Sequence, residues 1–273
     1  MLQKLTEKII KTLFLLSTLC VISISFFLLF YVISNGIRFI SLKFIFTNPQ
    51  NMGLSGGIFS ILVGTMVISI LSVFISVPLG ISTALFLVEY SKETTLTRII
   101  RFGIESLAAI PSIIYGLFGF IFFVIYLRLG WSILSGSLTL SLMILPLIIR
   151  TSEEAIKAVP YRWRIVSYSL GANKIQTIWK VVLPSAAPGI LTGIVLSLGR
   201  CVAESAAVIF TAGVATKMPT SAFDSIRTMA VHFYILVREG ISTNNAFATG
   251  CVLLTLTLLI NAISYLIVYR FRK

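Results

Sequence analysis

Two oppositely charged residues, Arg200 and Glu204, stand inside a long apolar run of this 273-residue chain. On a helix, residues four apart lie one turn from each other on the same face. A charged side chain at membrane depth costs about 2.5–3.5 kcal/mol on insertion scales, so it is kept where it has a partner or a task. The planar donors of Arg200 suit the oxygens of an oxyanion, with Glu204 orienting the guanidinium. The pair thus predicts an anion path, and an ion pair that only locks the helices together is the alternative.

The composition places these residues in a polytopic helical membrane protein. The chain is 57% hydrophobic and 11% charged, whereas soluble domains are nearer 25% charged. Several uncharged apolar stretches reach about 18 residues, the length that spans a bilayer as a helix. We therefore predict an all-α fold with six transmembrane helices. They are placed near residues 13–34, 58–88, 104–127, 133–149, 185–210 and 248–269.

Membrane topology, rather than nucleic acid, explains the net charge of +13. Most of the 22 lysines and arginines fall on the predicted side that holds both termini and residues 150–184. Because positively charged loops stay inside, we expect a multi-pass protein of the cytoplasmic membrane with cytoplasmic N- and C-termini and no nucleic-acid partner. The first apolar run is too long for the core of a signal peptide, which predicts an uncleaved first span. No Cys or His spacing typical of a metal site occurs, and we expect neither metal nor cofactor.

Residues 150–184, called here the docking segment, combine helix-forming sequence with regular breaks. Pro160 must end the helix that leaves the fourth span, and a second short helix can follow over residues 161–170. Gly171 suits the left-handed residue that ends a helix. Asn173 can then cap a third helix, with Gln176 at the reciprocal position of a capping box.

Apolar side chains cover much of the circumference of these short helices. The second carries Trp163, Val166 and Leu170 on one line, and the third has Ile175 and Trp179 on its stripe. Such a surface needs a partner. A loop that packs on its own membrane domain is the alternative.

The last external loop predicts a helix at the outer interface. Asp224 or Ser225 can cap it, and an apolar face would run to about Arg238. His232 is expected there as an interfacial polar residue rather than a ligand, because no second His or carboxylate cluster accompanies it.

Two other patterns concern packing. Residues 2–12 alternate apolar and lysine positions at helical spacing, which predicts a short interfacial helix. Gly189, Gly193 and Ser197 form a stripe of small residues that permits close helix approach.

The docking segment resembles the "EAA" coupling loop of ATP-binding-cassette importer permeases. The resemblance lies in Ser169-Leu170-Gly171-Ala172, followed after a gap by Val-Val-Leu-Pro-Ser-Ala-Ala-Pro-Gly-Ile. It implies that the short helix before the glycine fits a groove on a cytoplasmic ATPase, with residues 169–172 in the contact. Residues 165–167, Ile-Val-Ser, stand where the motif has Glu-Ala-Ala, so Arg162 or Arg164 is expected to supply the polar contacts.

Further stretches resemble the phosphate-importer permeases of the PstA type. They are Arg-Thr-Ser-Glu-Glu-Ala-Ile-Lys-Ala-Val-Pro (150–160), Gly-Arg-Cys-Val-Ala-Glu-Ser (199–205), Phe-Thr-Ala-Gly (210–213) and the external run through Arg-Glu-Gly (238–240). The resemblance implies a type I ABC importer permease fold with its core over residues 58–273, preceded by an N-terminal region of residues 1–57. It also implies that Arg200 and Glu204 handle phosphate. A second homologous permease, or a second copy of this chain, and an extracytoplasmic phosphate-binding protein would be its partners.

Energetics separates the candidate functions. Moving one negative charge into an inside-negative cell costs about 2.3 kcal/mol per 100 mV, so a divalent anion needs an energy source. No phosphate-binding loop of an ATPase occurs in the chain,, which predicts a separate ATPase and no enzyme activity in this subunit.

External residues 38–57 and 217–238 are the expected landing surface for the binding protein. The alternatives are a permease for another oxyanion, molybdate or sulfate, and an intramembrane enzyme, which lacks a catalytic constellation.

Overall fold

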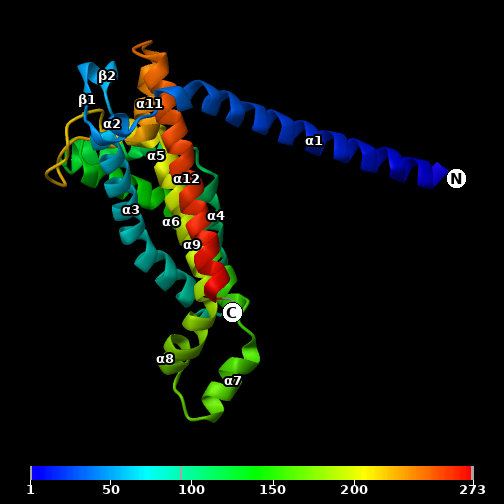
Figure 1. Ribbon diagram of the computed structural model, residues 1–273. Coiled ribbons are helices and arrows are strands. Elements are labelled where there is room, and N and C mark those ends of the chain that lie inside the picture. The colour runs from blue at the N-terminus through cyan, green and yellow to red at the C-terminus, as the bar shows by residue number, and fades with distance from the viewer. Residues whose placement is uncertain (1, 93, 272–273) are drawn as a thin grey trace.

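The spans expected from hydropathy form long helices, except that the third is bent and the fifth, residues 185–210, is broken after Ala203. The computed structural model describes residues 2–92 and 94–271. Within them, five helices are long and apolar enough to cross a membrane. The number is six if a bent pair of helices is counted as one span. The five are α1 (Leu2–Gly36), α3 (Phe59–Leu85), α6 (Ile133–Lys157), α9 (Leu183–Ala203) and α12 (Thr243–Phe271) (Figure 1).

The predicted third span, residues 104–127, is not one straight helix. Helix α4 (Thr95–Ala109) stops before Pro111, and α5 (Ser112–Gly119) continues as a π-helical stretch, Phe120–Tyr126. The two parts are bent by 98°. Proline disfavours helical backbone at the residue before it, and Ile110 is accordingly extended, at φ −68° and ψ 130°. The third predicted span is therefore a pair of helices bent at Pro111.

Short elements connect the spans at the two ends of the molecule. One end holds α2 (Leu42–Phe46), the two-residue antiparallel strands β1 (Pro49–Gln50) and β2 (Ser55–Gly56), and α11 (Met229–Arg238) (Figure 1). The opposite end holds α7 (Tyr161–Ser169) and α8 (Lys174–Thr177). A π-helical stretch, Ile178–Val182, leads from α8 into α9, and α10 (Ala206–Thr211) follows α9 after a break.

The core lies where α3, α6 and α9 pack together. Its largest fully buried side chains include Ile68, Leu140, Ile144 and Ile148. Small residues let these helices approach closely, as is usual in membranes. A side chain at Gly193 would strike Thr151 of α6, and one at Gly189 would lie 2.6 Å from Ala155. The predicted close approach along this stripe is confirmed.

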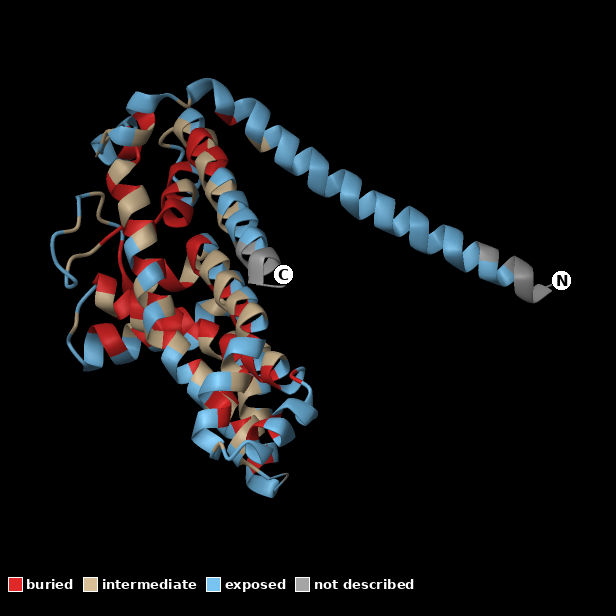
Figure 2. Cartoon of the chain, turned by 60° about the horizontal axis from the view of Figure 1, so that its bottom comes forward, coloured by how far each residue is buried: buried red, intermediate tan, exposed pale blue. Residues whose placement is uncertain are grey.

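Helix α1 projects away from the rest of the chain (Figures 1 and 2). None of its most apolar 18-residue window is buried. The C-terminal end of α1 contacts α12, where the Cys251 thiol donates to the Val32 carbonyl at 3.2 Å. The prediction of a separate interfacial helix over residues 2–12 is wrong, because no Pro or Gly interrupts the chain before Gly36 and the helix continues through.

Helix α11 begins later, and lies deeper in the protein, than its sequence predicts. Asp224 accepts hydrogen bonds from the Thr220 and Ser221 amides at 2.7 and 2.8 Å, so it closes a turn instead of capping a helix. Helix α11 starts at Met229, whose amide donates to the Thr65 hydroxyl of α3 at 2.8 Å. His232 is 1% exposed, which makes the interfacial placement wrong.

Candidate functional site

Arg200 lies in the last turn of helix α9, and Glu204 directly follows the end of that helix. Helix α9 stops at Ala203, and Glu204 has extended backbone at φ −77° and ψ 131°. Its carboxylate accepts the Ala207 amide at 3.1 Å and so caps α10. No ion pair joins Arg200 to Glu204 in the described part of the chain. The carboxylate of Glu204 is thus used by the next helix and not by Arg200.

Among the described residues, the guanidinium of Arg200 has no carboxylate partner. It occupies the last turn of α9 and is solvent-exposed in the single chain. It makes no hydrogen bond or ion pair with residues 2–92 or 94–271. An unpaired charge at membrane depth faces a water-filled cavity or the interior of a helix bundle rather than lipid. The arrangement therefore presents a planar donor group at a helix break, where an anion could be bound.

The docking segment has the local structure that its sequence predicts. Gly171 adopts φ +84° after α7, and Asn173 and Gln176 form both hydrogen bonds of the capping box. Seven large apolar residues of the segment are at least 45% exposed. They are Tyr161, Trp163, Ile165, Val166, Leu170, Ile175 and Trp179.

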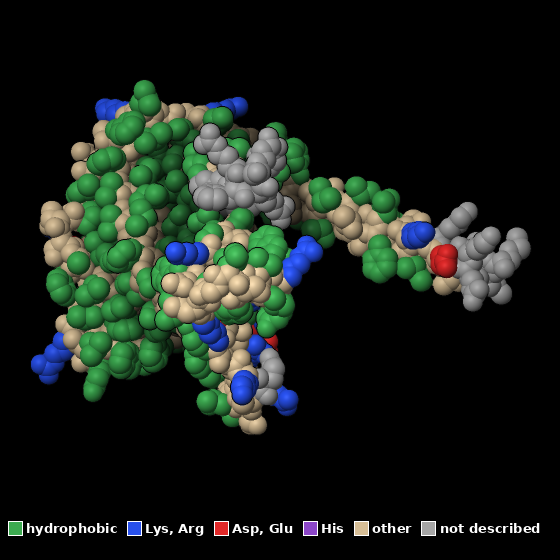
Figure 3. All heavy atoms as spheres, turned by 90° about the horizontal axis from the view of Figure 1, so that it is seen from below, with side chains coloured by type: hydrophobic (Ala, Val, Ile, Leu, Met, Phe, Trp, Pro, Cys, Tyr) green, Lys and Arg blue, Asp and Glu red, His purple; other side chains and the backbone are tan. Residues whose placement is uncertain are grey.

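This apolar surface is left uncovered by the chain itself. Leu170, at the tip, is 83% exposed. Seen from below, the molecule shows blue Lys and Arg side chains beside the green hydrophobic ones (Figure 3). The alternative of a loop packed entirely on its own membrane domain does not fit this exposure.

Arg164 is inside the protein, contrary to the expectation that it contacts an ATPase. Its Nε and Nη2 donate to one oxygen of Glu89 at 3.0 and 2.7 Å. Its Nη1 donates to the Val159 carbonyl at 2.8 Å and its Nη2 to the Ile156 carbonyl at 3.1 Å. Only 6% of the residue is exposed. The reason is electrostatic, because a buried guanidinium needs a carboxylate and carbonyls to replace water.

The remaining predicted contact residues lie at the surface. Arg162, Ser169, Leu170 and Gly171 are exposed, and Ala172 is half-buried. Sequence reasoning missed Glu89, which directly follows the second apolar run. The carboxylate at the end of this span could have indicated a buried ion pair, because a charge at such a position usually has a partner.

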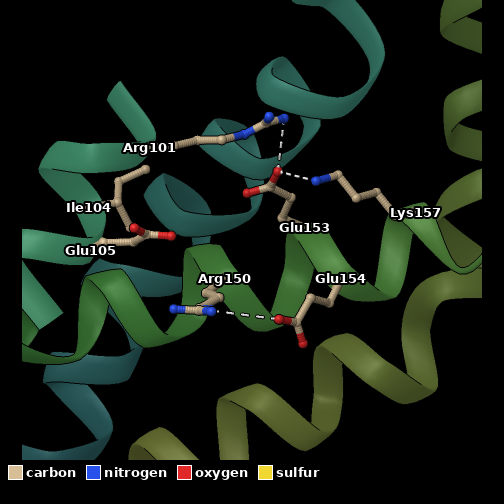
Figure 4. Close-up of a pocket in the computed structure, with 7 residues that line it drawn as sticks. All are labelled: Arg101, Ile104, Glu105, Arg150, Glu153, Glu154 and Lys157. Atoms are coloured by element: carbon tan, nitrogen blue, oxygen red, sulfur yellow. Dashed lines mark ion pairs between the residues drawn. The ribbon is translucent and has the colours of Figure 1, made fainter. Parts of the chain in front are cut away.

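A second cluster of charges joins α4 to the C-terminal part of α6 (Figure 4). One oxygen of Glu153 meets Arg101 at 3.0 Å and Lys157 at 2.6 Å. Arg150 and Glu154 pair more loosely at 3.6 Å. Glu105 and Ile104 complete the lining of a cavity of about 170 Å³. Its cationic and acidic side chains are equal in number, so the cluster suits a tether between helices better than an anion site.

Comparison with known proteins identifies relatives of the chain. Residues 76–273 match the family described as "Binding-protein-dependent transport system inner membrane component". The chain is 34% identical over 262 residues to the "Probable ABC transporter permease protein YqgI" of Bacillus subtilis, covering 91% of this chain and 89% of the relative. It is 39% identical over 159 residues to the "Phosphate transport system permease protein PstA 1" of Mycobacterium tuberculosis strain CDC 1551 / Oshkosh. That match covers 58% of this chain and about half, 52%, of the relative.

A solved structure supplies the fold. A chain in the crystal structure of a bacterial ABC transporter involved in the import of the acidic polysaccharide alginate superposes with a TM-score of 0.65. The superposition covers 97% of this chain and 99% of that one, at 17% identity. At this identity the likeness concerns the fold alone, which is the all-α permease fold of type I ABC importers.

Proposed function

Since this chain belongs to the family of binding-protein-dependent transport system inner membrane components, we propose that it is the permease subunit of an ATP-driven phosphate importer. In this role it forms the path for inorganic phosphate across the cytoplasmic membrane. A separate ATPase drives the movement. Phosphate is named by the relatives that carry the PstA name. A permease for molybdate or sulfate is the other candidate, because both are oxyanions that an arginine can bind.

The observation that carries this proposal is the unpaired Arg200 at the break between α9 and α10. Arg200 lies about 24 Å along the helix from Pro184 at 1.5 Å per residue. Irregular backbone at membrane depth is tolerated where it lines a cavity or is buried in protein. Glu204 holds the break in place through its bond to the Ala207 amide. Arg200 is thereby left to bind an anion that passes along the chain.

The docking segment supports coupling to a separate ATPase. Its short helices expose apolar side chains at one end of the molecule (Figure 1), and the chain has no phosphate-binding loop of its own. The positive charges of this segment support a cytoplasmic position for it and for the N- and C-termini. Exposed Arg162, Ser169, Leu170 and Gly171, with half-buried Ala172, would meet the ATPase.

Helix α1 supports a second permease subunit. Its apolar surface is uncovered along the whole 18-residue window, and lipid alone gives a single projecting helix no fixed position. A homologous permease or a second copy of this chain would cover part of it. The external residues 38–57 and 217–238 would receive the extracytoplasmic phosphate-binding protein.

Uptake into proteoliposomes that contain the partner subunits tests the cargo. We expect ATP-dependent uptake of phosphate that excess sulfate or molybdate fails to compete away. Arg200→Ala should abolish uptake, while Arg200→Lys should retain a fraction, because lysine keeps the charge without the planar donors. Glu204→Gln keeps an oxygen that accepts from the Ala207 amide but removes the negative charge. It therefore distinguishes the role of Glu204 in capping α10 from the role of its charge. Unchanged uptake by Arg200→Ala would overturn the proposed path.

A further inference from the structure

The outer end of the molecule contains two neighbouring cavities that share one buried arginine. They have volumes of about 520 and 770 Å³, and Arg227 lines both. Met52, Ile209, Phe210 and Val214 also line both, so Arg227 lies on the wall between the two spaces. Arg227 is the one charged residue that the linings of both cavities share.

Arg227 is a buried cation that pairs with no carboxylate of the described residues. The residue is 5% exposed. Its Nε donates to the Val214 carbonyl at 2.9 Å, and its Nη1 lies 3.3 Å from both the Met52 carbonyl oxygen and His232 Nδ1. Among the described residues, no carboxylate lies within ion-pair distance and no hydrogen bond is made by Nη2. One edge of the guanidinium is therefore held by the protein, and the other keeps free donors beside the cavities.

His232 does not supply the missing charge. Burial, followed by the nearby Arg227, lowers the pKa of His232 to about 4. It is neutral near pH 7 and can accept through Nδ1. Burial also lowers the pKa of Arg227, and the more distant Glu239 opposes that effect. Arginine remains protonated in proteins even so, which leaves a net positive charge in a desolvated place.

Other residues of the two cavities add positive charge. Arg238 lines the smaller cavity, where its Nη1 donates to the Tyr234 hydroxyl at 3.1 Å. Lys217 lines the larger one. Glu239 is the single acidic residue in the two linings. The excess of cations contrasts with the balanced cluster around Glu153, and a desolvated cleft of one sign concentrates ions of the other.

The smaller cavity also reaches the helix break. Ser205, the residue after Glu204, lines it together with Ala206, the first residue of α10. The cavity therefore joins the external loop that carries Arg227 to the place where α9 ends.

We propose that Arg227 and Arg238 form an outer binding site for a tetrahedral oxyanion, which occupies it before reaching Arg200. The site would take phosphate as the cargo, and in that respect it rests on the proposed function. Arg227 binds the anion through its free Nη2 edge, and Arg238 adds a second, exposed cation at the mouth. The site sets how well the permease captures its cargo at low concentration, whereas Arg200 acts further along the path.

The test measures the concentration dependence of uptake by the complete transporter in proteoliposomes. The variants are Arg227→Lys and Arg238→Gln. Arg128→Gln is the matched control, because it removes an external positive charge that lines neither cavity. We expect both site variants to raise KM for phosphate about tenfold with Vmax nearly unchanged, Arg238→Gln to keep the thermal unfolding midpoint, and Arg128→Gln to keep the wild-type KM. Arg238 is exposed, so its variant remains informative if Arg227→Lys folds poorly.

The outcomes separate this site from the cargo assignment. Phosphate uptake with wild-type KM in both variants would overturn the outer site and leave the proposed function standing. An equal rise of KM in Arg128→Gln would also overturn it, because that result indicates general attraction of anions to the outer face. A wild-type transporter that takes up sulfate or molybdate instead, with KM for that anion raised in both site variants, would support the site and overturn phosphate as the cargo.

Discussion

Arg164 donates two hydrogen bonds, at 3.0 and 2.7 Å, to the same carboxylate oxygen of Glu89. The two residues lie 75 positions apart, and each side chain is only 7% exposed. Lys174 donates to the main-chain carbonyl of Glu89, and its ammonium lies 4.3 Å from the centre of the Tyr90 ring. The docking segment is thus fastened at two points to the π-helical stretch Phe86–Tyr90, which continues α3. A force applied to this segment by a partner would reach the core through these contacts.

The first prediction concerns this buried pair. Glu89→Gln should lower the free energy of unfolding by about 3–5 kcal/mol, because breaking a buried ion pair leaves an uncompensated charge. Thermal unfolding of the purified protein in detergent measures the loss. The double variant Glu89→Gln with Arg164→Met should recover part of it, since the unpaired cation is removed.

Glu154→Gln is the matched control for Glu89→Gln. Its carboxylate pairs with Arg150 at 3.6 Å, and both side chains are more than half exposed. Exposed pairs contribute about 0–1 kcal/mol, so the unfolding midpoint should barely move. Equal midpoints for the two glutamate variants would contradict the anchoring role of Glu89.

Local chemistry explains which parts of this molecule are predictable from sequence. Pro160, Gly171 and the pair Asn173–Gln176 act within a few residues of chain, and the structure has them as expected. The apolar runs likewise predict the long helices, because their length matches the bilayer.

The errors arise where distant parts of the chain meet. Arg164 looks available in sequence, and only the fold brings Glu89 to it. His232 looks interfacial until α11 is packed against Gly53, where an added Cβ would lie 2.5 Å from the imidazole. Glu204 follows a helical pattern, yet the backbone turns there and the carboxylate caps α10. The roles of Arg200 and Glu204 in transport stay predictions.

The second prediction distinguishes the left-handed backbone conformation of Gly171 from the space around this residue. The residue has φ +84°, and no atom lies within 4 Å of an added Cβ. Gly171→Ala therefore adds only backbone strain, about 1–2 kcal/mol. Gly171→Glu adds a charged side chain to the same strain. We expect Gly171→Glu to abolish ATP-dependent uptake with normal membrane insertion, and Gly171→Ala to keep most of the uptake. Full uptake by Gly171→Glu would refute docking at this tip.

The third prediction tests the close contact between α9 and α6. A Cβ at Gly193 would collide with the Thr151 side chain, whose hydroxyl is held by the Leu147 carbonyl at 2.9 Å. Overpacking of this kind costs about 1–3 kcal/mol, so Gly193→Ala should lower the thermal unfolding midpoint. Gly103, inside α4, has no atom within 4 Å of an added Cβ. Gly103→Ala should leave stability unchanged or raise it by up to about 1 kcal/mol. A midpoint no lower in Gly193→Ala than in Gly103→Ala would show that the helices are not packed this closely.

The fourth prediction follows from the neutral state of His232. Burial and Arg227 lower its pKa to about 4 in the folded protein, against about 6.5 in the unfolded chain. The unfolded state therefore binds the proton more readily, and stability that is present above pH 6.5 is lost as the pH falls towards 4. A shift of this size corresponds to about 3 kcal/mol at most. Thermal unfolding in detergent from pH 7 to pH 4 should show a steep fall in the midpoint for the wild type.

His232→Gln isolates the part of that fall that belongs to the imidazole. Glutamine carries no titrating group, and its amide oxygen can accept from Arg227 as Nδ1 does. The carboxylates that also titrate on acidification, such as Glu89 and Glu153, remain in the variant. Its midpoint should start lower at pH 7, because the ring that fills the space beside Gly53 is lost, and then decline less steeply with acid. Parallel curves for the two proteins would mean that His232 has the same pKa in the folded and unfolded states, and would contradict the lowered pKa.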